Sequence, residues 1–83
     1  MYYQLYFEKD KCIIKVKAMD RSIQRADIIN KLNSLDENDV WDYNIYYKFS
    51  RNKKVLKQVA EEMKAEWIKE LADRMKQIEE IKI

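Results

Sequence analysis

The chain of 83 residues contains no glycine, no proline and no histidine, and it has a single cysteine, Cys12. Without glycine, phosphate-cradling loops, the dinucleotide-binding fingerprint and the nucleophile elbow are excluded, because each needs backbone freedom or a close approach that glycine supplies. Without histidine, the chain lacks the commonest metal ligand and the side chain that ordinarily titrates near neutral pH. One thiol forms neither an internal disulfide nor a cysteine-rich zinc site. These absences predict a protein that is not an enzyme, with no catalytic residues, no cofactor and no metal site.

The bulk composition predicts one folded domain over residues 1–83. About half of the residues are apolar, and 17 basic and 15 acidic residues are interspersed to give a net charge of +2. That balance is typical of a globular chain rather than a disordered one. No apolar run approaches the roughly 18 residues of a membrane span, so we expect no membrane association. A lone cysteine and the lack of a secretion signal predict a cytoplasmic protein.

The first 18 residues predict a β-hairpin. Two sets of alternating apolar residues flank Lys9 and Asp10, namely Tyr3, Leu5 and Phe7, then Cys12, Ile14, Val16 and Ala18. A two-residue turn at Lys9 and Asp10 pairs Phe7 with Cys12 and places both apolar sets on one face of the sheet. We therefore expect Cys12 to point into the core.

Two helices and one more strand follow the hairpin. Asp20 can cap a helix that runs from about Arg21 to Asn33, where apolar residues recur at helical spacing. The alternation from Trp41 to Phe49 predicts a half-buried third strand. Ser50 can cap a final helix from Arg51 to about Ile81.

This order, ββαβα, predicts an α+β fold with one three-stranded antiparallel sheet and two helices on one face. A strand-helix-strand crossover makes the third strand parallel to the second, so it pairs most simply beside the first. The expected strand order is therefore 2-1-3. The helices would cover the face that carries Leu5, Ile14, Trp41 and Tyr43, and Trp41 and Trp67 would lie in the core.

The expected topology concentrates basic side chains at one end of the molecule, which we call the basic end. The acidic loop, formed by Asp36, Glu37, Asp39 and Asp42, would lie at the opposite end beside the hairpin turn. Both helices would begin at the basic end, where a helix N-terminus disfavours cations unless an anion binds there. A solvated patch with no partner is an equal alternative. The predicted partner-binding residues are Lys17, Arg21, Arg25, Lys48, Arg51, Lys53, Lys54 and Lys57.

The last helix is longer than the sheet can cover. At 1.5 Å per residue it would extend about 45 Å, whereas eight-residue strands span about 27 Å. Its apolar stripe continues through Leu71, Met75 and Ile78. We expect these residues to contact a partner chain or a second copy in a homodimer, unless the helix bends, frays or is covered by the first helix.

These features favour a small interaction protein that binds another macromolecule, a host protein or nucleoprotein, and modulates or inhibits it. Lys, Ile, Asn and Tyr supply 34 residues against nine for Gly, Ala, Pro and Arg, a skew expected of AT-rich coding DNA. Small size, no catalytic groups and this skew are typical of inhibitors carried by phages and mobile elements, including inhibitors of CRISPR nucleases. That comparison rests on no motif in the chain.

The alternative hypothesis is a sequence-tolerant nucleic-acid-binding protein that uses the basic end for phosphate contacts. Such binding would weaken steeply as salt concentration rises. The small net charge of +2 disfavours it, because dedicated nucleic-acid binders of this size are usually more basic.

Overall fold

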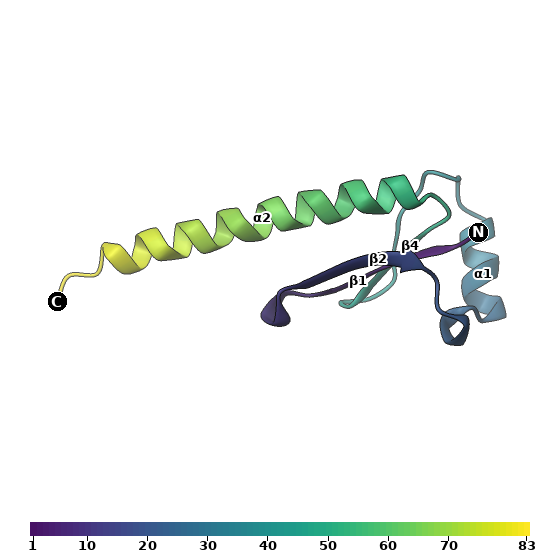
Figure 1. Cartoon of the computed structure of the whole chain (residues 1–83), viewed down its shortest axis with the longest axis horizontal. Coiled ribbons are helices and arrows are strands. Elements are labelled where there is room, and N and C mark those ends of the chain that lie inside the picture. The colour runs from purple at the N-terminus through teal and green to yellow at the C-terminus, as the bar shows by residue number, and fades with distance from the viewer.

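The computed structural model describes residues 1–83 and shows an α+β fold with one antiparallel sheet, a long C-terminal helix that runs along the sheet and a short helix at the end of the sheet near the N-terminus (Figure 1). The α+β class, the antiparallel sheet and the long C-terminal helix are confirmed, whereas the prediction of three strands is wrong. The sheet has four strands in the order β2-β1-β4-β3. The elements are β1 (Tyr3–Glu8), the 3-10 turn η1 (Lys9–Lys11), β2 (Ile13–Ala18), the 3-10 turn η2 (Arg21–Ile23), α1 (Ala26–Asn33), β3 (Trp41–Asp42), β4 (Tyr47–Ser50) and α2 (Lys53–Glu79).

The predicted third strand is a tight hairpin instead of one continuous strand. Asn44 interrupts it, because its side-chain Oδ1 accepts hydrogen bonds from the backbone N–H groups of Tyr46 and Tyr47, both at 2.8 Å. Such a side-chain turn competes with regular strand pairing. The chain folds back on itself, so Trp41 pairs with Phe49, while Ile45 at the bend is 75% exposed. Only β4 takes the expected place beside β1.

The turn of the first hairpin is two residues longer than predicted. Lys9 to Lys11 form η1, and Cys12 follows with φ 55° and ψ 44°, in the left-handed region. The register therefore pairs Phe7 with Ile14 rather than with Cys12. A shift of two residues keeps every strand side chain on its expected face. Cys12, however, lies outside the strands and is exposed, so its predicted core position is wrong.

Cys12 is the only residue of the chain with a positive φ, and it identifies a stabilising substitution. A side chain in the left-handed region costs about 1 to 2 kcal/mol, a penalty that glycine avoids. We expect Cys12→Gly to raise the free energy of unfolding by about 0.5 to 1 kcal/mol after its greater freedom in the unfolded chain is considered. Thermal unfolding should show a midpoint about 2 to 8 °C higher. Cys12→Ala, which keeps the Cβ, should not reproduce the gain.

The two helices cover opposite faces of the sheet, so the expectation of both on one face is wrong. The reason lies in the register: Phe49 pairs with Gln4 and Trp41, whereas Leu5 pairs with Lys48 and points to the other side. α1 buries Ile28 and Leu32 on the Phe49 face. The apolar residues packed there are Met19, Ile28, Leu32 and Phe49, flanked by Tyr2, Ile23, Ile29, Trp41 and Tyr47.

α2 lies along the Leu5 face and contacts β1, β2 and β4. Leu5 and Leu56 are fully buried in this layer. The helix begins at Lys53, two residues later than predicted, and Asn52 caps it, with Oδ1 accepting from the Lys54 N–H at 3.0 Å. Ser50 is instead buried in β4, and its Oγ accepts from the Asn52 N–H. α2 then continues past the hairpin turn to the far C-terminal end (Figure 1).

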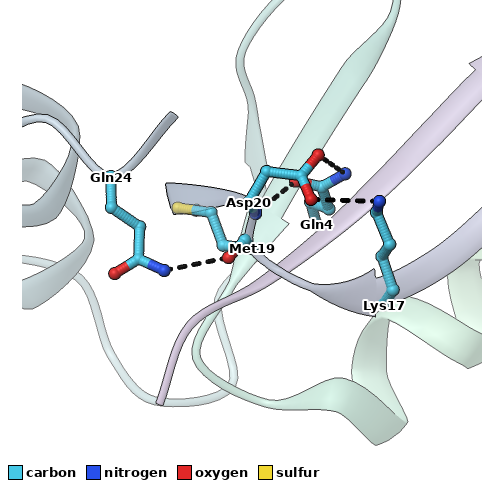
Figure 2. Close-up of polar contacts among 5 residues, drawn as sticks. All are labelled: Gln4, Lys17, Met19, Asp20 and Gln24. Carbon is cyan, nitrogen blue, oxygen red and sulfur yellow. Dashed lines mark hydrogen bonds and ion pairs between the residues drawn. The ribbon is translucent and has the colours of Figure 1, made fainter. Parts of the chain in front are cut away.

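The connection from β2 to α1 is held by side chains rather than by the predicted cap at Asp20. Figure 2 shows the Asp20 carboxylate between Lys17, at 3.0 Å, and the Gln4 side-chain amide, at 3.3 Å. Gln4 is buried, and its Oε1 accepts from the Asp20 N–H at 3.0 Å. Gln24 donates to the Met19 carbonyl at 2.9 Å. These bonds fix η2 against the sheet, and the first helix starts at Ala26 instead of Arg21.

The Asp20 contacts predict a loss of stability in acid. The hydrogen bond from Lys17 holds the pKa of Asp20 below its ordinary value near 3.8, although desolvation acts in the opposite direction. A lowered pKa means that the ionised carboxylate stabilises the fold above about pH 4, and this stabilisation is lost as the pH falls through the lowered pKa. Thermal unfolding of Asp20→Asn should therefore depend less on pH between about pH 4 and pH 2 than that of the wild type. An unchanged slope would contradict this role.

Candidate functional site

The distal part of α2 carries an exposed apolar stripe, formed by Leu71, Met75 and Ile78 and hereafter called the distal stripe. These residues are 62%, 55% and 65% exposed. The molecule extends 57 Å along its longest axis but only 22 Å and 17 Å along the others, which reflects the overhang of α2 (Figure 1). The 27 residues of α2 span about 40 Å, whereas the six residues of β1 span about 20 Å. The structure leaves the distal stripe without a covering element.

The distal stripe is part of a seam with the spacing of a short coiled coil. Ile68, Leu71, Met75 and Ile78 are separated by three, four and three residues, which places them on one side of the helix. Residues four positions before and after this set are Lys64 and Lys82. The seam therefore has four apolar positions, which correspond to about two heptads. A self-sufficient coiled coil is identified by three or four heptads.

A groove of about 550 Å³ lies between α2 and the outer strand of the first hairpin. We call it the β2 groove. Trp67 is half-buried and lines the groove, so its predicted place in a closed core is wrong. The salt bridge between Lys9 and Glu70 joins the hairpin turn to α2 near this point. The lining residues are Lys9, Cys12, Ile14, Lys64, Trp67, Ile68 and Leu71.

The predicted partner-binding cations come from both faces of the sheet. α2 begins on the Leu5 face of the sheet, whereas η2 and the start of α1 lie on the Phe49 face. Lys53, Lys54 and Lys57 lie in the first two turns of α2, and Arg21 and Arg25 precede α1. Several members of the set contact groups within the chain: Lys17 pairs with Asp20, Lys48 with Asp42, Arg25 with Asp27 and the Tyr43 hydroxyl, and Arg51 with the Leu35 carbonyl.

The acidic loop lies beside the start of α2, so its predicted position at the opposite end is wrong. Arg51 donates to the Leu35 carbonyl, and Asn52 Nδ2 donates to Asn38 Oδ1 at 2.6 Å. The cause is the hairpin of β3 and β4: a single strand would place its two ends far apart, whereas a hairpin brings Val40 and Ser50 to the same end of the sheet. Asp36, Glu37 and Asp39 can therefore offset nearby cations. Whether the remaining cations bind a partner stays a prediction.

Comparison of the chain with protein-family models, with curated proteins and with solved structures gave no match.

Two further features of the structure bear on the candidate site. No group of three or more His, Cys, Asp and Glu side chains is arranged to hold a metal ion. Neither helix combines the length and the apolar character that crossing a bilayer requires.

Arg51 differs from its basic neighbours because its side chain supports the fold. The residue is half-buried, one guanidinium nitrogen donates to the Leu35 carbonyl, and Nε is buried with no hydrogen-bond partner. We expect Arg51→Glu to lower the free energy of unfolding by about 1.5 to 3 kcal/mol, because it removes a charged hydrogen bond and places a carboxylate against a carbonyl. Urea unfolding measures this loss. Lys54→Glu, at an exposed site in the first turn of α2, should be neutral or slightly stabilising.

Sequence reasoning found the distal stripe from its helical spacing but missed the β2 groove. Ile68 could have indicated more apolar surface near the groove, because it lies three residues before Leu71 and extends the apolar side of the helix. The predicted strand order 2-1-3 also placed the second strand at an edge of the sheet. The groove depends on the longer turn of the first hairpin, because this turn places Cys12 beside Ile14, and both residues line the groove together with Trp67.

Proposed function

We propose that this chain is a non-enzymatic interaction protein whose distal stripe binds another protein. The observation that carries the proposal is the exposure of Leu71, Met75 and Ile78 on a regular helix that no other element covers. Contiguous apolar surface of this kind is a common mark of protein-protein contact. Its neighbours Arg74, Gln77 and Glu79 include both charges, which fits an apolar interface centre with a polar rim.

A protein partner is favoured over a nucleic acid. Phosphate binding needs several free cations on one surface. In this structure Lys48 and Arg51 contact groups of the chain itself, and the acidic loop lies beside the start of α2. The proposal therefore rests on apolar burial at the distal stripe. Nucleic-acid binding by the basic end would instead give a steep salt dependence, whereas burial of the stripe should depend weakly on salt.

A different protein is favoured over a second copy of the chain. The seam of four apolar positions ends at Lys64 and Lys82, so two copies of α2 aligned on it would bury only about two heptads. A partner with its own apolar groove could cover the stripe more fully. We propose that the chain modulates or inhibits the partner by occupying the partner's surface.

The test compares stripe and control variants in partner capture. The stripe variant is Met75→Ala with Ile78→Ala, and the control is Lys69→Ala with Lys76→Ala, on the other side of the same helix. A protein of the native host retained by the wild type and the control, but weakened at least tenfold by the stripe variant when the purified pair is titrated calorimetrically, supports the proposal. Equal binding by both variants contradicts it. Light scattering that shows a dimer lost in the stripe variant would assign the stripe to a second copy.

A further inference from the structure

The outer edge of β2 has backbone N–H and C=O groups that form no hydrogen bonds to another strand. β2 is the first strand in the order β2-β1-β4-β3, so no strand of the sheet pairs with its outer side. The Met19 N–H donates to the Tyr2 carbonyl at 2.9 Å, and hydrogen-bonded pairs alternate along an antiparallel ladder. Lys17 and Lys15 therefore direct their N–H and C=O groups to β1. The N–H and C=O groups of Ile14, Val16 and Ala18 point away from the sheet, where a further strand could bond to them.

The side chains of those same three residues lie on the face that α2 covers. Ile14 pairs with Phe7, Val16 with Leu5 and Ala18 with Tyr3. Ile14 also lines the β2 groove together with Trp67 and Ile68. A strand added beside β2 would present every second side chain to this face. Apolar side chains at those positions would enter the groove.

The other face of the same edge is basic. Lys15 and Lys17 alternate with the outward-bonding residues, and their side chains lie on the α1 face of the sheet. Lys15 makes no salt bridge within the chain, and Lys17 pairs only with the exposed carboxylate of Asp20. In two copies paired through β2, these lysines would face one another, and like charges directly opposite destabilise a sheet. Acidic side chains on the incoming strand would instead be attracted.

We propose that the β2 edge binds an extended segment of a partner protein in which apolar and acidic residues alternate. The segment adds a fifth strand to the sheet, with backbone hydrogen bonds to Ile14, Val16 and Ala18. Its apolar residues occupy the β2 groove, and its Asp or Glu residues face Lys15 and Lys17. Lys15 and Lys17 thus disfavour a second copy of the chain by repulsion and favour an acidic partner by attraction.

This site goes beyond the proposed function, because it uses a strand edge rather than the distal stripe. The two surfaces meet only at Leu71, which lines the groove and belongs to the stripe. Met75 and Ile78 lie outside the groove lining. The stripe variant Met75→Ala with Ile78→Ala therefore separates the two proposals: it should retain all binding at the β2 edge.

The first experiment is selection of binders from a displayed library of random twelve-residue peptides. The purified full chain is the target. We expect enriched peptides to alternate apolar residues with Asp or Glu. Selection of peptides with apolar residues at spacings of three and four, selection of basic peptides, or no enrichment would overturn the proposal, because a helix-binding groove or an inert edge would then describe the surface better.

The second experiment measures amide hydrogen exchange of the wild type with a synthetic copy of the most enriched peptide. Strand addition should slow exchange at Ile14, Val16 and Ala18 by at least tenfold and should change Lys15 and Lys17 much less, since their N–H groups already bond to β1. The bound peptide should also slow the reaction of Cys12 with a thiol reagent, because Cys12 lines the groove. Binding without this alternation of protection would overturn strand addition.

The third experiment uses matched variants, each checked for folding by circular dichroism. Lys15→Glu should weaken the selected peptide about tenfold, because it replaces an attraction with a repulsion, whereas Lys69→Glu on the outer side of α2 should not. Val16→Pro removes one outward N–H and should abolish binding, because proline is tolerated on an edge strand whose N–H faces solvent. If this variant fails to fold, the exchange measurement on the wild type decides. Unchanged binding by Lys15→Glu would overturn the predicted acidic preference.

Discussion

Phe49→Ala is expected to remove a large part of the free energy of unfolding. Phe49 is fully buried, contacts the rings of Trp41, Tyr43 and Tyr47 at centroid distances of 5.9, 5.2 and 5.9 Å, and belongs to the cluster that includes Ile28. Truncation of a buried phenylalanine costs about 3 to 5 kcal/mol. A chain of this length has about 4 to 12 kcal/mol of stability in total. Urea unfolding followed by circular dichroism measures the loss.

Ile45→Ala in the same hairpin is the control for Phe49→Ala. Ile45 is 75% exposed at the bend between β3 and β4, so its truncation should change the free energy of unfolding by less than about 0.5 kcal/mol. Both residues were expected to lie on the buried face of one continuous strand. Equal effects at the two positions would restore that single strand and contradict the hairpin at Asn44.

Local patterns predicted the elements of this fold more fully than their connections. Alternation at Leu5 and Val16 identifies β1 and β2, and the helical spacing around Leu56 identifies α2. In each element, apolar residues recur with the period at which the backbone directs side chains to the core. The bend at Asn44 depends on one side chain accepting two backbone hydrogen bonds, which leaves the apolar alternation of its neighbours unchanged. That one bend adds a strand and brings the acidic loop to the start of α2.

Of the candidate surfaces, the distal stripe could likewise be predicted from local spacing, whereas the β2 groove depends on tertiary packing. Leu71, Met75 and Ile78 were predicted because an apolar stripe longer than the sheet must end beyond it, and their exposure follows from length alone. The β2 groove depends on where α2 crosses the sheet relative to β2, which no spacing within either element specifies. Lys17 and Lys48 likewise point to different sides of the sheet because of the strand register, which the spacing within either strand does not specify.

Leu56→Ala is expected to cost about 2 to 5 kcal/mol, because Leu56 is fully buried in the first turns of α2, on the Leu5 face of the sheet. Leu71→Ala, which shortens the same side chain on the same helix, should cost less than about 0.5 kcal/mol at a site that is 62% exposed. Alanine is also the better helix former, so the helix content of Leu71→Ala should not fall.

The two leucine variants test whether the first half of α2 packs on the sheet while the second half extends beyond it, as the proposed function requires. If only Leu56 matters for folding, the first half of the helix anchors it to the sheet and the second half is held out as a rigid extension with a free apolar side. A large cost at Leu71 that grows with protein concentration would mean that a second copy covers the stripe, because only association makes stability depend on concentration. A large cost independent of concentration would mean that the monomer covers Leu71 itself, and the stripe could then bind no partner. A small cost at Leu71, combined with the loss of partner binding in the stripe variant, would assign the side chains of the distal stripe to recognition rather than to folding.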